Sequence, residues 1–244
     1  MKAPHSPLTQ YYGEERDRAG WVRGLFDRTA ADYDRIERAM AFGSGSWYRR
    51  RALARAGLRS GMRVLDIGTG TGLTAREAAH LAGASAQVIG VDPSAGMMER
   101  AKVPAGVRLM CGTAEEIPSP ASSADFISMG YALRHVADLS SVLREFMRVL
   151  APGGRVCLLE ITAPDSRLQR AALKAYMRGV VPLMARCMAA HRDMPKLMRY
   201  YWDTIENCAH PSLILAAMCD AGLVDVYRHV DLGIFSDYCG RKPL

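Results

Sequence analysis

Three glycines at alternating positions follow a short apolar segment, at Gly68, Gly70 and Gly72. The segment 64–67 has the composition of a buried β-strand, and a helical pattern begins at Leu73. Glycine lets the backbone pass close to a bound ligand, because no Cβ intervenes. The Gly-x-Gly-x-Gly spacing differs from the dinucleotide fingerprint, whose third glycine would fall at Leu73. The segment therefore predicts a strand, a tight turn and a helix N-terminus that hold a small ligand.

Two aspartates accompany this glycine turn. Asp66 lies in the strand that precedes the turn, and Asp92 follows the next apolar run, 88–91. A carboxylate at the end of the second strand of such a unit accepts hydrogen bonds from ribose hydroxyls. We therefore expect Asp92 to bind the ribose of a ligand that the glycine turn holds.

Arg134 and His135 form a second candidate group, directly after the fourth predicted strand. Ligands of parallel sheets bind at the carboxyl ends of the strands, so both residues are expected beside the ligand. A histidine, with a reference pKa of about 6.5, can act as a base around neutral pH. We predict that His135 deprotonates or orients an acceptor, and that Arg134 holds a ring oxygen or stabilises an enolate. The alternatives are a structural histidine and a salt bridge from Arg134 to Glu160 or Asp138.

Strand-like and helix-like segments alternate through the middle of the chain. Such alternation predicts an α/β fold with a doubly wound, mostly parallel sheet. The predicted strands are 63–67, 87–91, 107–110, 125–129 and 155–161, and the predicted helices are 73–82, 94–101, 139–150 and 212–221. The segments 223–230 and 233–239 are predicted to form a closing β-hairpin.

Helical segments flank this core in the sequence. Residues 21–36 and 47–58 have helical patterns and are separated by a break that contains Gly and Ser. The predicted units are an N-terminal flap and helical lid at 1–60, a Rossmann-like core at 61–164, a helical cap insertion at 165–210, and a C-terminal helix with the closing hairpin at 211–244.

Aromatic side chains are frequent in the predicted lid and cap. Tyr11 and Tyr12 interrupt a polar tail, which predicts either a hydrophobic anchor or a flap that covers a ligand. Aromatic rings can sandwich a planar acceptor. The candidates for this role are Tyr11, Tyr12, Trp47, Tyr176, Tyr200 and Trp202.

Composition restricts location and partners. The chain of 244 residues has no apolar run of membrane-spanning length and no signal segment, so we expect a cytoplasmic protein without an integral membrane segment. The net charge is +7, but the arginines are scattered over helix-like faces. We therefore expect no nucleic-acid partner, with attraction to an anionic substrate or lipid surface as the alternative. No Cys-x-x-Cys pair occurs among the six cysteines, so we expect no metal.

Several motifs resemble the ubiquinone/menaquinone-type C-methyltransferases, which are class I enzymes dependent on S-adenosylmethionine. The matching segments lie between about residues 22 and 241: Phe26-Asp27-Arg28-Thr29-Ala30-Ala31-Asp32-Tyr33-Asp34, Phe42-Gly43, the glycine turn, Leu133-Arg134, Arg148-Val149-Leu150-x-Pro152-Gly153-Gly154, Glu160 and Arg199-Tyr200. The glycine turn and the Pro-Gly-Gly turn are common to many methyltransferases, whereas the N-terminal block and the Leu-Arg pair are more specific. The resemblance implies a class I methyltransferase fold and S-adenosylmethionine as methyl donor.

The resemblance also implies which residues hold this cofactor. Asp66 and the backbone of the glycine turn would hold the methionine end, Tyr33 would close over it, and Asp92 would bind the ribose. The residues implied around the adenine are Met97 or its neighbour Met98, Thr113 and Ala114.

This chain departs from the family pattern at three of the matched places. His135 and Glu37 stand where the family has Asn, and Thr113 stands where it has Asp or Asn. These departures favour a member recruited to another small planar acceptor. We therefore predict methyl transfer to carbon or nitrogen of a small redox-active aromatic or heteroaromatic ring. A toxoflavin-type azapteridine is favoured, and C-methylation of a ubiquinone or menaquinone precursor is the alternative.

Two other classes of protein agree less well with the sequence. A non-catalytic accessory protein would not need an intact glycine turn with Asp66 and Asp92. An RNA methyltransferase would carry an Asn/Asp-Pro-Pro-Tyr-type element after the fourth strand, where this chain has Gly130-Tyr131-Ala132-Leu133.

Overall fold

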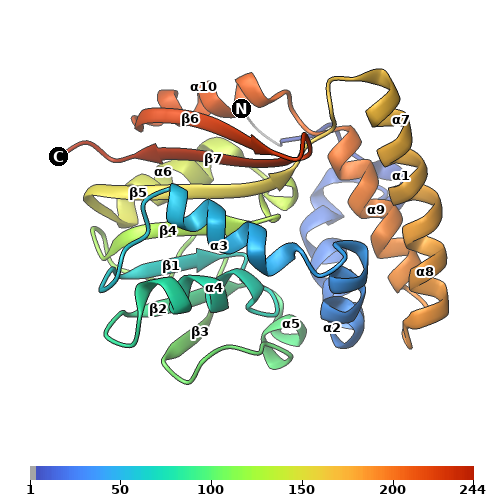
Figure 1. Ribbon diagram of the computed structural model, residues 1–244, viewed down its shortest axis with the longest axis horizontal. Coiled ribbons are helices and arrows are strands. Elements are labelled where there is room, and N and C mark those ends of the chain that lie inside the picture. The colour runs from blue at the N-terminus through green and yellow to red at the C-terminus, as the bar shows by residue number, and fades with distance from the viewer. Residues whose placement is uncertain (1–3) are drawn as a thin grey trace.

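A seven-stranded sheet with the order β3-β2-β1-β4-β5-β7-β6 forms the centre of the protein. The computed structural model describes residues 4–244. The strands are β1 (Val64–Ile67), β2 (Val88–Asp92), β3 (Val107–Cys111), β4 (Ala124–Gly130), β5 (Leu150–Ile161), β6 (Val224–Asp231) and β7 (Phe235–Arg241). The first five are parallel, and β7 runs antiparallel to both β5 and β6. The predicted doubly wound, mostly parallel sheet is therefore confirmed (Figure 1).

Helices cover both faces of this sheet, which is why β1 and β2 are buried along their whole length and apolar except for Asp66 and Asp92. One face packs on α3 (Gly45–Arg55) and α4 (Leu73–Ala82), and the other packs on α6 (Leu139–Val149) and α10 (Pro211–Asp220). A short helix, α5 (Ala95–Glu99), follows β2. The helix expected at 94–101 is thus shorter than predicted.

The order of the strands reverses between β1 and β4. Parallel strands on either side of such a switch point leave a crevice at their carboxyl ends. The glycine turn after β1, Asp92 at the end of β2 and the loop after β4 therefore meet at one edge. Strand β5 begins at Leu150, earlier than the predicted 155, because Leu150 pairs with Ala124 before a register shift in the ladder.

The lid and the cap stand together beyond this edge of the sheet, on the right in Figure 1. The lid elements are α1 (Thr9–Tyr12), η1 (Glu15–Asp17) and α2 (Arg18–Met40), and the cap elements are α7 (Arg167–Ala175), the π-helical turn η3 (Tyr176–Val180), α8 (Val181–Met188) and α9 (Met194–Glu206). The two groups share a hydrophobic cluster, the lid–cap cluster, which includes Leu25, Ile36, Leu197 and Trp202. Helix α2 extends beyond the predicted 21–36 at both ends. Within residues 4–244, no helix combines the length and hydropathy needed to cross a membrane.

The N-terminal tail is anchored in this cluster. Leu8 and Tyr12 are buried in it, and the Tyr11 hydroxyl donates a hydrogen bond of 2.6 Å to Asp203 on α9. His5 forms an isolated β-bridge with Cys208. Of the two predicted roles for the tail, these contacts favour the anchor. Residues 1–3 of the predicted flap lie outside the described residues.

Candidate functional site

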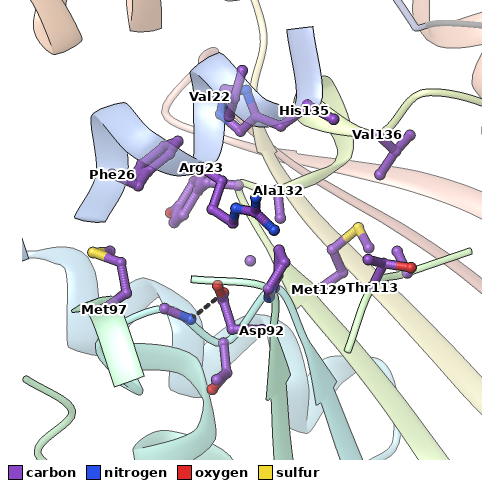
Figure 2. Close-up of a pocket in the computed structure, with 18 of the residues that line it drawn as sticks. Val22, Arg23, Phe26, Asp92, Met97, Thr113, Met129, Ala132, His135 and Val136 are labelled. Atoms are coloured by element: carbon purple, nitrogen blue, oxygen red, sulfur yellow. Dashed lines mark hydrogen bonds between the residues drawn. The ribbon is translucent and has the colours of Figure 1, made fainter. Parts of the chain in front are cut away.

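A cavity of about 570 Å³ lies between α2 and the carboxyl ends of β1, β2 and β4. Figure 2 shows Asp92, Met97 and Thr113 on the sheet side of this cavity and Val22, Phe26 and His135 on the lid side. The lining also includes the predicted residues Tyr33, Gly68, Gly70 and Ala114. The structure thus brings together eight of the predicted site residues: Tyr33, Gly68, Gly70, Asp92, Met97, Thr113, Ala114 and His135.

The glycine turn adopts left-handed backbone angles, with φ of 68° at Gly68, 54° at Gly70 and 82° at Gly72. Only glycine adopts these angles readily. A Cβ on Gly68 would lie 2.5 Å from the Cβ of Ala132, and one on Gly72 would lie 2.3 Å from Cγ1 of Val103. Gly68 and Gly70 line the cavity, whereas Gly72 is the N-cap residue of α4 and does not line it.

Asp92 lines the sheet side of the cavity and is buried. Its Oδ2 accepts a hydrogen bond of 2.7 Å from the amide of Gly70, and its Oδ1 accepts one of 2.8 Å from the amide of Ser94. Burial raises the pKa of this carboxyl to about 6. Each carboxylate oxygen has two acceptor sites, so both can also accept a hydroxyl. Together with the glycine turn, these acceptors fit the ribose of S-adenosylmethionine.

Asp66 lies under the turn and does not line the cavity. Its two oxygens accept hydrogen bonds of 2.7 Å from Thr69 Oγ1 and Ser128 Oγ, and burial raises its pKa to about 6. The structure therefore places Asp66 where it fixes the turn to β4, and not where a ligand would contact it.

The predicted N-terminal block ties the lid to the core. Asp27 on α2 accepts hydrogen bonds from Ser94 Oγ and the amide of Gly96, and Asp34 accepts one of 2.5 Å from Thr71 Oγ1. Both carboxylates thus hold α2 against the segments that follow β1 and β2, which form the sheet side of the cavity. Tyr33, which lies between them in the sequence, lines the cavity.

His135 reaches the cavity from the loop after β4, but as a weak base. Burial and the positive charges of Arg134 and Arg18 lower its pKa well below 6.5. Its ring lies edge-on to Phe26 and stacks on Tyr200, with centroid separations of 5.4 and 5.5 Å. The imidazole is therefore neutral near pH 7, where it can accept or donate a hydrogen bond.

Arg134 points away from the cavity. Its guanidinium forms a buried ion pair of 2.7 Å with Glu160 and lies 4.3 Å from the ring centroid of Tyr201. The salt bridge expected as the alternative is thus present. Its side chain joins α9 to β5, and contact with an acceptor would require this pair to break.

The six aromatic residues predicted to hold a planar ring do not line the cavity. Tyr11, Tyr12, Tyr200 and Trp202 belong to the lid–cap cluster, and Tyr176 donates a hydrogen bond to the carbonyl of Met40. Trp47 is half-exposed beside Arg51. Tyr200 approaches the site indirectly, with its hydroxyl 3.4 Å from Nδ1 of His135.

Several cavity residues were missed by the sequence analysis. Val22, Phe26 and Arg23 come from α2, and Met129 and Tyr131 come from the end of β4. The helical period identified Val22 and Phe26 as apolar, but it did not show which of them would face a cavity. Nothing in the sequence identified Arg23 as a cavity residue, because this basic chain has many arginines and no motif includes this one.

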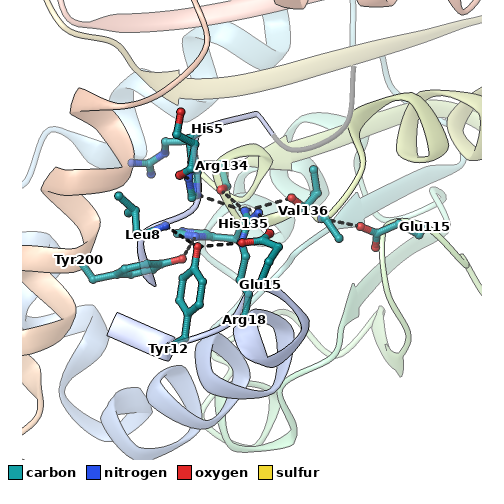
Figure 3. A network of polar contacts seen from close by, with 12 residues as sticks. His5, Leu8, Tyr12, Glu15, Arg18, Glu115, Arg134, His135, Val136 and Tyr200 are labelled. Atoms are coloured by element: carbon teal, nitrogen blue, oxygen red, sulfur yellow. Dashed lines mark hydrogen bonds and ion pairs between the residues drawn. The ribbon is translucent and has the colours of Figure 1, made fainter. Parts of the chain in front are cut away.

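Arg18 at the start of α2 was also missed. This buried side chain donates hydrogen bonds of 3.0 and 3.1 Å to the carbonyls of Arg134 and Val136, on either side of His135. It also pairs with Glu15 and lies 3.2 Å from His5. Figure 3 shows this network joining the tail, α2 and the loop that carries His135.

One of the departures from the family pattern now has a structural explanation. Glu37 forms an ion pair of 2.9 Å with the buried Arg49, whose guanidinium lies 5.1 Å from the ring centroid of Tyr131. Arg49 and Tyr131 both line the cavity. Glu37 therefore holds Arg49 in the cavity wall, although Glu37 does not itself line the cavity.

The fold and this site are those of the class I methyltransferases that use S-adenosylmethionine. More narrowly, the chain belongs to the ubiE/COQ5 methyltransferase family, whose model matches residues 11–242.

Similar proteins agree with this assignment. The chain is 33% identical to a demethylmenaquinone methyltransferase of Symbiobacterium thermophilum, over 94% of each chain. It is 30% identical to a ubiquinone/menaquinone biosynthesis C-methyltransferase, UbiE, of Pseudomonas syringae pv. tomato, over 94% of this chain and 91% of that protein. A Thermotoga maritima methyltransferase, described as a possible histamine N-methyltransferase, shares the fold with a TM-score of 0.63 and 22% identity, over 90% of this chain and 98% of that one.

Proposed function

We propose that this protein methylates a ring carbon of a quinol precursor of menaquinone or ubiquinone. The observation that carries the proposal is the similarity to quinone C-methyltransferases over almost the whole chain. It favours the quinone alternative over the azapteridine that the sequence departures suggested, and no comparison supports the azapteridine.

The two sides of the cavity suggest how donor and acceptor are arranged. On the sheet side, Asp92 would hold the ribose of the cofactor, Thr113 and Ala114 would meet the adenine, and Gly68 and Gly70 would carry the methionine end. Under the lid, apolar side chains from α2 and β4 leave space for a flat ring. Holding the ring carbon in line with the methyl group accounts for much of the catalysis expected of such a site.

The sulfonium of S-adenosylmethionine supplies a methyl group that is already activated. In the proposed reaction a ring carbon would form the new bond as the carbon–sulfur bond breaks, which would leave S-adenosylhomocysteine, and the same ring carbon would then lose its proton to solvent. An ionised phenol beside that carbon makes it a better nucleophile. His135 is poorly suited to remove the phenolic proton because of its low pKa, so we assign it to orient the phenol through a hydrogen bond.

Arg23 is our candidate counter-ion for this phenolate. It extends from α2 into the cavity near Ala132 (Figure 2) and has no carboxylate partner among residues 4–244. A cation that faces the acceptor site would favour the ionised phenol. Arg23→Gln should therefore raise the pH needed for half-maximal turnover without altering cofactor affinity.

The function is tested by incubating the purified protein with methyl-labelled S-adenosylmethionine and one of three acceptors: demethylmenaquinol, a demethylated ubiquinol precursor or an azapteridine. Mass spectrometry of the products should find the label on a ring carbon of a quinol. Labelling of the azapteridine alone would overturn the proposal while leaving the methyltransferase assignment in place.

A further inference from the structure

The outer edge of the cap carries an apolar surface that nothing in the described chain covers. Elements α7, η3 and α8 form one continuous helical rod over residues 167–188. Its inner side, including Met177, Val181 and Ala185, is buried against the lid–cap cluster. Its outer side exposes Leu168, Val180 and Leu183, which are 80%, 53% and 63% accessible. The rod is therefore apolar on two sides, of which only one is packed.

Phe42 extends this exposed surface from the turn between α2 and α3. Its side chain is 85% accessible, and its ring stacks on Tyr176 of the rod with a centroid separation of 6.1 Å. The backbone of Phe42 has a φ of 48°, a left-handed conformation that is costly for a residue of this kind. We call Phe42, Leu168, Val180 and Leu183 the outer apolar face.

Positive charge surrounds this face. Between Asp165 and Asp193 the chain has no acidic residue but six basic ones: Arg167, Arg170, Lys174, Arg178, Arg186 and Arg192. Lys174 and Arg178 have carboxylate partners on α9. The other four have no ion pair within the described part of the chain.

From this combination we infer that the outer apolar face docks on the surface of a membrane that contains anionic lipids. A helix with exposed apolar side chains and flanking arginines lies in the interfacial plane of a bilayer, where the apolar groups enter and the cations stay among the headgroups. A second copy of the chain is a poorer occupant, because a symmetric contact would bring the same unpaired arginines against each other. Docking is independent of the acceptor proposed above, although it would bring the cavity to a membrane-dissolved substrate.

Vesicle sedimentation tests the inference with the full-length protein. The protein should bind vesicles of phosphatidylcholine with phosphatidylglycerol, and should bind pure phosphatidylcholine vesicles much less. Added salt should weaken binding, because it screens the arginines. Leu168→Glu and Leu183→Glu should each weaken binding by about tenfold or more, since each loses buried apolar area and adds a repelled charge.

Leu213→Glu is the matched control, because Leu213 is also an exposed leucine on a helix, 52% accessible, but lies on α10, which packs on the sheet and is not part of the rod. It should bind vesicles like the wild type. Absence of binding by the wild type would overturn the inference, as would equal loss in all three variants. Concentration-dependent dimerisation abolished by Leu183→Glu, without vesicle binding, would also overturn it. Methylation of a short-chain, water-soluble quinol should be unchanged in the variants, so a failure of docking is distinguishable from a failure of the proposed function.

Discussion

Replacing Asp92 by asparagine is the sharpest test of the cofactor side of the cavity. The carboxylate already accepts the amides of Gly70 and Ser94, and its remaining lone pairs face the cavity. Asparagine keeps one acceptor oxygen but places an NH₂ group against one of these two amides. A hydrogen bond to a charged group is worth about 1.5–3 kcal/mol. Loss of one such bond with strain in the turn should weaken binding of S-adenosylhomocysteine by about 2–3 kcal/mol, or about 30- to 150-fold.

The pH dependence gives this prediction a second readout. The pKa of Asp92 is raised to about 6, so lowering the pH through that value protonates the carboxyl and removes acceptors for the ribose. Affinity should therefore be highest above about pH 6 and fall below it. Asp66 has a similar pKa, so the effect belongs to Asp92 only if it disappears in Asp92→Asn.

Isothermal titration calorimetry at several pH values, with thermal melting alongside, measures both effects. Asp237→Asn is the matched control, because Asp237 is a buried strand aspartate that pairs with Arg55 and does not line the cavity. It should lower the melting temperature and leave cofactor affinity unchanged. If Asp92→Asn bound the cofactor as the wild type does, the ribose would have to be held by another residue.

Three further perturbations test other parts of the site. His135→Asn should change turnover by less than about tenfold, because the neutral imidazole and the amide both form hydrogen bonds, and it should add no acidic limb to the pH–rate profile. A loss of about 10²–10⁴-fold in steady-state turnover would instead indicate that His135 is a general base. Glu160→Gln should lower the free energy of unfolding by about 3–5 kcal/mol in denaturant titrations, since it leaves Arg134 charged and unpaired in the interior; an unchanged midpoint would mean that Arg134 finds another partner. Deleting residues 1–17 should lower the melting temperature as well as activity, because it removes buried apolar side chains from the lid–cap cluster. Loss of activity at an unchanged melting temperature would instead favour the role of the tail as a flap over the ligand.

The core of the fold could be predicted because its signals are local. Each parallel strand is a short apolar run, and each core helix shows its own period, so the order of elements follows from reading along the chain. The predicted ends of the strands were less accurate where hydrogen bonding to a neighbouring strand decides them. Strand β5 starts at Leu150 because Ala124 offers a partner, and no local pattern in the Pro-Gly-Gly turn shows that.

The acceptor side of the site could not be predicted in the same way. Tyr200 and Trp202 have the composition expected of a ring-binding wall, yet both are buried in the lid–cap cluster. Whether an aromatic residue on a helix faces a core or a cavity depends on how that helix packs, and the cap packs on the distant N-terminal segment. Arg18 illustrates the same limit, because its role depends on carbonyls more than a hundred residues away in the chain.

Arg134 and His135 are adjacent in the sequence after β4, but their side chains face different parts of the protein. Arg134 and His135 share one turn of 3₁₀-helix, Leu133–His135, in which successive side chains point in different directions. His135 enters the cavity, while Arg134 turns to Glu160 in the interior. The two are still linked, because the buried charge of Arg134 helps to depress the pKa of His135. The side chain of Arg134 thus affects His135 without lining the cavity, because its charge adds to the effect of burial in lowering the pKa of the imidazole.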